Sequence, residues 1–217
     1  MRIYLKTTPN KESVYFNYQP LLTGVLHKWL GENDIHGELA LHSFSWLQGS
    51  KKINDTLEFK HGATFFISFY DVTNIRQIIK NIRVEPELFH GMVVKDIIIG
   101  DNPDLSDNFM LGSPVFVRRG IEGKDIHYSY EDVNVGRLME ETLRNKMRKA
   151  GIPDDATLQI EFDLQYVGKK IKMVNYRNIR NKTNWCPLII KGKPETKLFA
   201  WNVGIGNSTG IGFGSIF

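Results

Sequence analysis

The chain has 217 residues and a formal net charge of +4, and hydrophobic residues make up 41% of it. This length suits one large domain or two domains of about 100 residues each. No apolar run approaches the ~18 residues of a membrane span, and the single cysteine, Cys186, excludes an internal disulfide framework and a cysteine-based zinc site. Because the N-terminus also lacks the apolar block of a signal peptide, we expect a cytoplasmic protein with no membrane partner.

The first half of the chain predicts two helices and four strands in the order β-α-β-β-α-β. Apolar residues recur at three- and four-residue spacing after Pro20, from Leu21 to Leu30, which is typical of a helix with one buried stripe. A second helical period runs through residues 72–82. The expected strands are rich in alternating or β-branched residues and lie at 2–7, 39–46, 63–69 and 92–99. This order is the ferredoxin-like arrangement.

The second half repeats that order with one insertion. Turn-rich residues at 101–104 and 107–108 place a boundary near residue 110, so we expect one domain at 1–110 and another at 111–217. Helices are expected at 133–150 and 195–203, and an inserted basic hairpin at 170–179. The expected strands lie at 114–118, 157–167, 187–191 and 211–216. The sequence therefore predicts an α+β protein with tandem ferredoxin-like (RRM-like) βαββαβ domains.

The positive charge is concentrated between residues 166 and 197. This stretch holds nine basic residues and one acid, a net +8, whereas the remaining 19 basic and 23 acidic residues give −4. Tyr166, Tyr176 and Trp185 are interleaved with the cations, and this combination is typical of proteins that bind single-stranded or hairpin RNA. A solvated basic hairpin is the alternative. The cations that we expect to bind RNA here are Lys169, Lys170, Lys172, Arg177, Arg180 and Lys182.

Five glycines lie within the eleven residues 204–214. Exposed N–H groups in such a loop can form a concave nest for phosphate oxygens. No βαβ unit follows the loop and no lysine follows its glycines, so dinucleotide and nucleoside triphosphate binding are not expected. A tight turn between the last two strands is the alternative. The loop residues that we expect to contact RNA are Gly204, Gly206, Ser208, Gly210, Gly212 and Gly214.

Six histidines are candidates for proton transfer. No pair of them has a metal-ligand spacing, so neither a metal nor a cofactor is expected. His27 falls on the polar face of the first helix with Thr23, and His36 lies in the loop before the second strand, where catalytic side chains are common. An ordinary exposed histidine is the alternative for both. His42 alternates within a strand, which favours a structural role.

Histidine suits RNA cleavage because its pKa of about 6.5 lets it give and take protons near neutrality. The 2′-hydroxyl beside the scissile phosphate is a built-in nucleophile, so the enzyme has to deprotonate it, protonate the leaving 5′-oxygen and stabilise the charge on the phosphorus oxygens. General acid–base catalysis of this kind contributes ~10²–10⁴-fold, and it requires no metal.

Three segments of the sequence resemble a known family. The pattern Gly204-Ile205-Gly206, followed after four residues by Ile211-Gly212-Phe213-Gly214, resembles the glycine-rich signature of CRISPR-associated repeat-processing endoribonucleases of the RAMP superfamily (the Cas six family). Residues 18–26 look like the first helix of that family. His36, followed by Phe44-Ser45-Trp46-Leu47, is similar to its histidine-containing segment. The resemblance covers nearly the whole chain.

This resemblance implies metal-independent cleavage of precursor CRISPR RNA within each repeat, leaving 5′-hydroxyl and 2′,3′-cyclic phosphate ends. By position, His36 matches the catalytic histidine, and His27 stands where many members have a tyrosine near the scissile phosphate. Ala40 stands where a lysine often occurs. The candidates for the missing charge-stabilising residue are therefore Lys51, Lys52 and Lys28; we also expect Lys51 and Lys52 to bind RNA.

The implied partners are CRISPR repeat RNA, other CRISPR effector subunits and a second copy of the chain in a homodimer. Two other functions are open on the sequence alone. The chain can be a non-catalytic subunit that holds the repeat or guide RNA, because such a subunit needs the same basic hairpin and glycine-rich loop. A nucleotide-binding enzyme that uses the glycine-rich loop is the third possibility.

Overall fold

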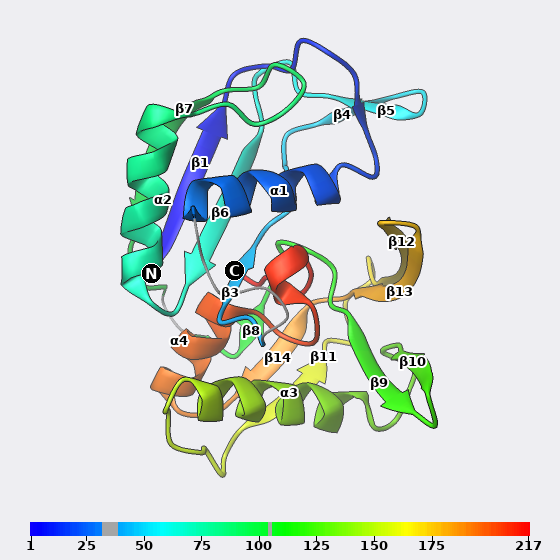
Figure 1. The fold of residues 1–217 in the computed structure, drawn as a ribbon. Coiled ribbons are helices and arrows are strands. Elements are labelled where there is room, and N and C mark those ends of the chain that lie inside the picture. The colour runs from blue at the N-terminus through cyan, green and yellow to red at the C-terminus, as the bar shows by residue number, and fades with distance from the viewer. Residues whose placement is uncertain (32–38, 104–105) are drawn as a thin grey trace.

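The computed structural model describes residues 1–31, 39–103 and 106–217, whose two main antiparallel sheets are each backed by two helices (Figure 1). The first sheet contains β1 (Arg2–Thr7), β3 (His42–Phe44), β6 (Thr64–Phe69) and β7 (Val94–Gly100) in the order β3-β6-β1-β7. The helices α1 (Gln19–Leu30) and α2 (Val72–Val84) cover one of its faces. This is the ferredoxin-like strand order predicted for the first half.

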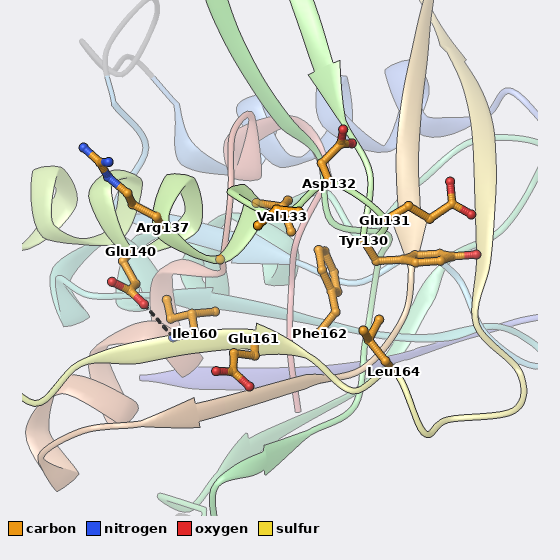
Figure 2. A pocket seen from close by; sticks show the side chains of 12 residues that line it. Tyr130, Glu131, Asp132, Val133, Arg137, Glu140, Ile160, Glu161, Phe162 and Leu164 are labelled. Atoms are coloured by element: carbon orange, nitrogen blue, oxygen red, sulfur yellow. Dashed lines mark hydrogen bonds between the residues drawn. The ribbon is translucent and has the colours of Figure 1, made fainter.

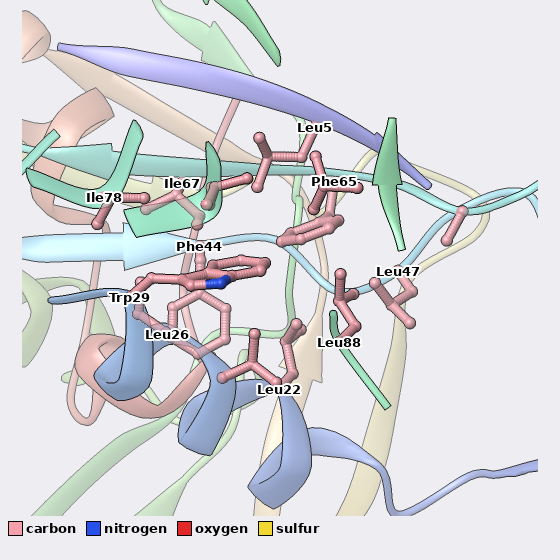
Figure 3. Packing of buried hydrophobic residues seen from close by; sticks show 14 of the residues in the cluster. Leu5, Leu22, Leu26, Trp29, Phe44, Leu47, Phe65, Ile67, Ile78 and Leu88 are labelled. Carbon is pink, nitrogen blue, oxygen red and sulfur yellow. The ribbon is translucent and has the colours of Figure 1, made fainter. Parts of the chain in front are cut away.

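Burial of the α1 stripe forms the core of the N-terminal half. Leu22, Leu26 and Trp29 pack with Phe44 and residues of β1, β6 and α2 in one cluster (Figure 3). Leu21, which the periodicity assigned to this stripe, is instead 46% exposed. A small separate sheet, ordered β2-β5-β4, adds β2 (Val14–Tyr15), β4 (Lys51–Ile53) and β5 (Thr56–Glu58) to this half.

The second sheet has the order β11-β14-β8, with β8 (Asn108–Phe109), β11 (Gln159–Phe162) and β14 (Leu188–Lys191). The last residues of the chain extend it beside β8, because Met110 and Phe217 exchange two backbone hydrogen bonds of 2.9 Å and Leu111 bridges Ile216. Behind the sheet lie α3 (Val135–Lys149) and α4 (Pro194–Val203). The tandem ferredoxin-like α+β fold predicted from the sequence is therefore confirmed.

Four predictions for the second half are wrong in detail. The expected strand at 211–216 begins in a 3-10 turn that includes Ile211, and only its last residue, Ile216, forms a β-bridge. The expected strand at 114–118 does not enter the sheet, because Val115 bridges Asn184 of the inserted hairpin and β9 (Val117–Ile121) pairs with β10 (Lys124–Tyr128). The expected strand at 157–167 ends at residue 162, where the Asp163 side chain accepts a hydrogen bond from Gln165 N and turns the chain. The basic hairpin is longer than expected, with β12 (Lys170–Tyr176) and β13 (Ile179–Trp185).

Arg2 joins the two halves. Its guanidinium is fully buried and stacks between the rings of Phe66 and Trp201, at 3.8 and 3.5 Å from their centroids. It donates hydrogen bonds to the carbonyl oxygens of Trp201 and Ile216, at 2.5 and 2.8 Å. Burial lowers the pKa of Arg2 to about 9, so it is charged at neutral pH.

Each half has its own hydrophobic cluster, whereas the division into domains at residue 110 stays a prediction. Of the helices that the structure describes, none has the length and apolarity to cross a membrane.

Candidate functional site

The glycine-rich loop (residues 204–214) lies between the two halves of the molecule. It leaves α4, makes one short 3-10 turn, η1 (Thr209–Ile211), and leads into the last residues beside β8. Gly206 and Gly214 both have positive φ, +82° and +64°. A β-carbon at Gly206 would lie 2.4 Å from the carbonyl oxygen of Phe116, and one at Gly214 only 1.9 Å from that of Ile205. Glycine is required at both positions because another backbone approaches so closely.

Most of the loop is used to hold the protein together. Four of its predicted RNA-binding glycines are buried, whereas Ser208 and Gly210 are half-buried. The loop amides that donate to protein backbone acceptors are those of Gly204, Ile205, Asn207, Ile211, Gly212 and Gly214. Because Gly206 and Phe213 are buried as well, the phosphate nest expected from the sequence could form only at the turn Ser208–Gly210, and contact of the loop with RNA stays a prediction. The buried glycines are Gly204, Gly206, Gly212 and Gly214.

The outer side of the loop packs against the N-terminal half. Gly210 faces Ala40 and the ring of His42, and Gly212 faces the ring of Phe44. The indole N–H of Trp46 donates to the Gly212 carbonyl at 2.7 Å. In addition, η1 contacts α1, the helix that bears His27. The loop therefore sets the position of α1 and β3 relative to the C-terminal half.

Lys146 of α3 holds the glycine-rich loop in place through hydrogen bonds. This lysine is fully buried, and its ammonium group donates to the carbonyl oxygens of Val203 and Gly204 at 3.0 and 3.1 Å and to the hydroxyl of Thr209 at 3.0 Å. All three ammonium hydrogens thus have acceptors in the loop or at its start. Burial lowers the pKa of Lys146 to about 7.

Two histidines lie near this loop. His42 is buried and stacks on Phe69, with 4.4 Å between ring centroids and 9° between ring planes. Burial, with the nearby charges of His27 and Lys146, lowers the pKa of His42 to about 3, so it is neutral at pH 7. This environment suits the structural role expected for His42. His27 is half-buried, and its electrostatic effect on His42 places it at the same interface.

The face of α1 that carries His27 is not a solvent-facing one. Thr23, one turn earlier on the same face, is buried and donates its hydroxyl to the Gln19 carbonyl at 2.9 Å. α1 also packs against η1, a contact that the helical periodicity of α1 alone does not reveal. The other predicted catalytic residue, His36, lies outside the described residues.

The charge-stabilising candidates have different surroundings. The Lys28 ammonium donates to the Glu87 carbonyl at 2.8 Å and forms an ion pair with Glu85 at 3.1 Å, so it is directed toward the end of α2. Lys51 and Lys52 are exposed on β4, and the Lys52 ammonium lies 5.5 Å from the centroid of the Phe16 ring. The hairpin of β4 and β5 extends on the same side of the molecule as β12 and β13 (Figure 1).

The basic hairpin distributes its cations over two faces and the tip. Alternation along β12 puts Lys170 and Lys172 on the face whose Val174 and Tyr176 pack beside Trp46, Phe116 and Phe213. Arg180 and Lys182 lie opposite Asn175 and Met173 and therefore on the other face. The tip is the exposed pair Arg177 and Asn178, both with positive φ, a two-residue type I′ turn. Lys169 precedes β12 and is half-buried.

A pocket of about 430 Å³ lies at the base of this hairpin and is lined by both halves of the chain. The Lys172 ammonium sits 4.4 Å from the Trp46 ring centroid and 5.8 Å from that of Trp185, within the range of cation–π attraction. Burial against these rings and the charge of Lys170 lower the pKa of Lys172. Aromatic faces, two lysines and an amide line this pocket: Trp46, Gln48, Tyr166, Lys170, Lys172 and Trp185.

A second pocket, of about 470 Å³, has the opposite character. It lies between α3 and β11, and carboxylates surround it (Figure 2), among them Glu131, Asp132, Glu140 and Glu161 against the single cation Arg137. Glu140 accepts a hydrogen bond from Ile160 N at 3.1 Å. None of the residues that the sequence predicts for catalysis or RNA binding lines this pocket, and its negative charge disfavours phosphate.

Two residues of this region were not found by sequence reasoning. Lys146 is the clearer case, because it follows Leu143 by three residues and so falls on the buried face of α3; a lysine at such a position indicates a buried cation. Trp46 was part of the family-like segment, but its hydrogen bond to Gly212 and its contact with Lys172 depend on two segments more than 120 residues away.

Comparison with known proteins gives one family and several similar folds. A family model described as "CRISPR associated protein Cas6, C-terminal" matches residues 101–216, more than half of the chain. A search of curated protein sequences gives no match.

Three solved structures are similar over 100% of this chain. One, described as the characterization of a Cas6-related gene from Pyrococcus furiosus, has 20% identity and a TM-score of 0.87, with 97% of that chain covered. Another, a CRISPR associated protein Cas6, has 16% identity, a TM-score of 0.84 and 98% coverage. The third, described as a RAMP protein binding different RNA substrates, has 21% identity, a TM-score of 0.82 and 98% coverage. At these identities the structural likeness shows the fold alone.

Proposed function

Because the chain belongs to the Cas6 family of CRISPR-associated, RNA-processing proteins, we propose that it is a metal-independent endoribonuclease that cuts precursor CRISPR RNA within each repeat. The observation that carries the proposal is the packing of the glycine-rich loop against α1 and β3. This packing brings the helix of His27 and the strand that follows His36 against the most glycine-rich part of the chain.

The proposed reaction uses the RNA's own nucleophile. One histidine removes the proton of the 2′-hydroxyl, whose oxygen attacks the adjacent phosphorus, and the other gives a proton to the departing 5′-oxygen. The products are a 2′,3′-cyclic phosphate and a 5′-hydroxyl. We assign these two proton transfers to His36 and His27. The half-buried position of His27 supports this role, because partial exclusion of water strengthens its interaction with a bound phosphate.

The negative charge on the phosphorus oxygens requires a cation or N–H donors. Lys28 is less suited to this role, because its ammonium already contacts Glu85 and the Glu87 carbonyl. We therefore assign it to Lys51 or Lys52, which are exposed. Ser208 and Gly210 are half-buried in the part of the loop whose amides are not all taken, and we propose that this turn contributes N–H donors.

The repeat RNA is proposed to bind along the basic hairpin and the pocket at its base. Lys170 and Lys172 supply positive charge beside Trp46, Trp185 and Tyr166, and every RNA base has a face that can stack on such rings. Lys169, Arg177, Arg180 and Lys182 extend the positive surface beyond the pocket. The domain division at residue 110 and assembly with other CRISPR subunits belong to the same proposal.

Cleavage of a labelled synthetic repeat RNA in EDTA, with protein in excess, tests this function. We expect one cut, with the cyclic phosphate and 5′-hydroxyl identified by mass spectrometry, and no cut when the nucleotide at the cleavage site is 2′-deoxy. His36→Ala and His27→Ala should each slow the single-turnover rate at least ~100-fold. His61→Ala, an exposed histidine elsewhere on the N-terminal half, is the matched control and should cleave like the native chain.

Each other outcome has a clear meaning. Tight binding of a repeat that stays intact would support the non-catalytic RNA-binding subunit instead. Near-native rates for both His27→Ala and His36→Ala would show that the proton transfers are wrongly assigned. A requirement for a divalent cation would refute the metal-independent mechanism.

A further inference from the structure

The strand β7 forms an open edge of the N-terminal sheet. It is the last strand in the order β3-β6-β1-β7, and it pairs with β1 along one side. Its sequence contains the run Ile97-Ile98-Ile99, of which Ile98 is 45% and Ile99 is 59% exposed. At its start this edge is covered, because Val94 donates its N–H to the Pro86 carbonyl at 3.0 Å and the preceding Val93 bridges Glu87. The exposed apolar part of the edge that follows offers a template on which another strand can pair.

The hydrogen bonds of the sheet determine which backbone groups point outward. Thr7 donates its N–H to Ala63 on the β6 side, and Thr8 donates to Val93 on the β7 side. Backbone groups alternate sides along a strand, so the odd-numbered residues of β1 point toward β6. Ile97 and Ile99 lie opposite odd-numbered residues of β1. Their N–H and C=O groups therefore point away from β1, and no acceptor or donor among the described residues pairs with them.

We propose that β7 pairs antiparallel with β7 of a second copy of this chain, in a register centred on Ile98. A two-fold axis at this point places Ile98 beside Ile98 of the second copy. Ile97 then exchanges backbone hydrogen bonds with Ile99 of the second copy, and the reverse pair does the same. The two four-stranded sheets become one continuous sheet of eight strands.

This register is self-complementary in both polarity and charge. It sets isoleucine against isoleucine on both faces of the sheet, and it brings Lys95 across from Asp101 of the second copy. Both of these charged residues are exposed. A register centred on Ile97 would instead place Asp96 against Ile98 and Lys95 against Ile99. One centred on Ile99 would place Ile97 against Asp101. A second copy thus pairs isoleucine with isoleucine and opposite charges with each other in the register centred on Ile98, but not in the registers centred on Ile97 or Ile99.

The proposed interface does not depend on the proposed RNA chemistry. In Figure 1, β7 and α2 lie at the side of the molecule opposite the hairpin of β12 and β13. Pairing through β7 therefore leaves the basic hairpin and the pocket at its base open in both copies.

Disulfide trapping tests the register directly. At the centre of the proposed pairing, the two residues at position 98 form a non-hydrogen-bonded pair with a Cα separation of about 4.5 Å, within the range that a disulfide spans. Ile98→Cys should form a covalent dimer under mild oxidation, seen on a non-reducing gel. The native Cys186 is fully buried and does not compete. Val84→Cys, 81% exposed on α2, is the control and should give at least ~10-fold less dimer.

Analytical ultracentrifugation of the reduced proteins provides the second measurement. The native chain should dimerise as its concentration rises, and Ile98→Lys should be monomeric because two lysines would meet at the axis. Lys95→Asp should weaken the dimer, and adding Asp101→Lys should restore it. Equal trapping of the two cysteine variants, no trapping at position 98, or a dimer that survives Ile98→Lys would each overturn the proposal. Circular dichroism checks that the variants fold, which we expect because the substituted side chains are exposed.

Discussion

The buried lysine beneath the glycine-rich loop leads to a quantitative prediction. Lys146→Met keeps an unbranched side chain that packs well in a core, but it removes the ammonium group that donates to Val203, Gly204 and Thr209. We expect the unfolding free energy of the native chain, minus that of this variant, to increase as the pH rises from 6.5 to 8.5.

The direction follows from proton binding. Burial lowers the pKa of Lys146 to about 7, whereas a lysine in the unfolded chain has a pKa of about 10.4. Between these values the unfolded chain binds more protons than the folded chain, so the stability of the native chain rises with pH. With a folded pKa of about 7, the native chain gains roughly 2 kcal/mol between pH 6.5 and 8.5, and Lys146→Met lacks this gain.

Urea unfolding of both proteins at pH 6.5, 7.5 and 8.5, at constant ionic strength, measures the difference. Lys80→Met removes an exposed lysine of α2 and controls for the loss of a lysine as such. A difference between the native chain and Lys146→Met that stays constant across this range would refute the reasoning. It would show that the three acceptors stabilise the ammonium enough to offset its burial.

Three further predictions concern other parts of the interface between the halves. Gly214→Ala should lower the unfolding free energy by roughly 2–4 kcal/mol, because the new β-carbon would meet the Ile205 carbonyl oxygen. Gly123→Ala, also at positive φ but in open space, should lower the unfolding free energy by only about 1 kcal/mol. Equal losses of the two variants in urea unfolding would contradict this prediction. Lys172→Gln should weaken binding of unpaired repeat RNA and reduce the slope of log Kd against log salt by roughly 0.7 if this lysine neutralises one phosphate; an unchanged slope argues against the contact. His42 has a pKa of about 3 in the folded chain and about 6.5 in the unfolded chain, so the unfolded chain binds more protons between pH 6.5 and 5. The unfolding free energy of the native chain should therefore fall by roughly 1.7 kcal/mol relative to that of His42→Phe over this range. Urea unfolding at the two pH values measures this change, and a constant difference would disprove it.

The sequence predicted those parts of the fold that depend on local periodicity. The spacing of Leu22, Leu26 and Trp29 was sufficient to identify α1 and its buried stripe. The same periodicity could not show that η1 packs against α1, because η1 lies about 180 residues later in the chain. His27 was therefore placed on the polar face with Thr23, but the sequence did not predict that Thr23 is buried and His27 half-buried on this face.

The strand expected at 114–118 shows a different limit. Its β-branched and aromatic residues do form extended structure, but Val115 pairs with Asn184 of the hairpin, and the sheet position is occupied by β8 instead. Propensity predicts an extended backbone without predicting its neighbour. The candidate site was limited in the same way, since the contacts of Trp46 with Gly212 and Lys172 join three distant segments.

The hydrogen bonds of the glycine-rich loop also limit what it can contribute to RNA binding. A backbone amide that donates to a protein acceptor is not available to a phosphate oxygen, and six amides of the loop are used in this way. Of the remaining amides, those of Gly206 and Phe213 belong to buried residues, so a direct contribution to RNA binding is expected from the turn at Ser208–Gly210, the part that packs nearest to His42 and α1. The glycines on either side of this turn act by permitting close backbone approach, and Lys146 holds the turn through Thr209. It follows that substitutions at Gly206 or Gly214 should lower the stability of the fold, and should affect RNA cleavage only because the fold is less stable. Substitutions at the turn, by contrast, can alter contact with RNA without unfolding the protein.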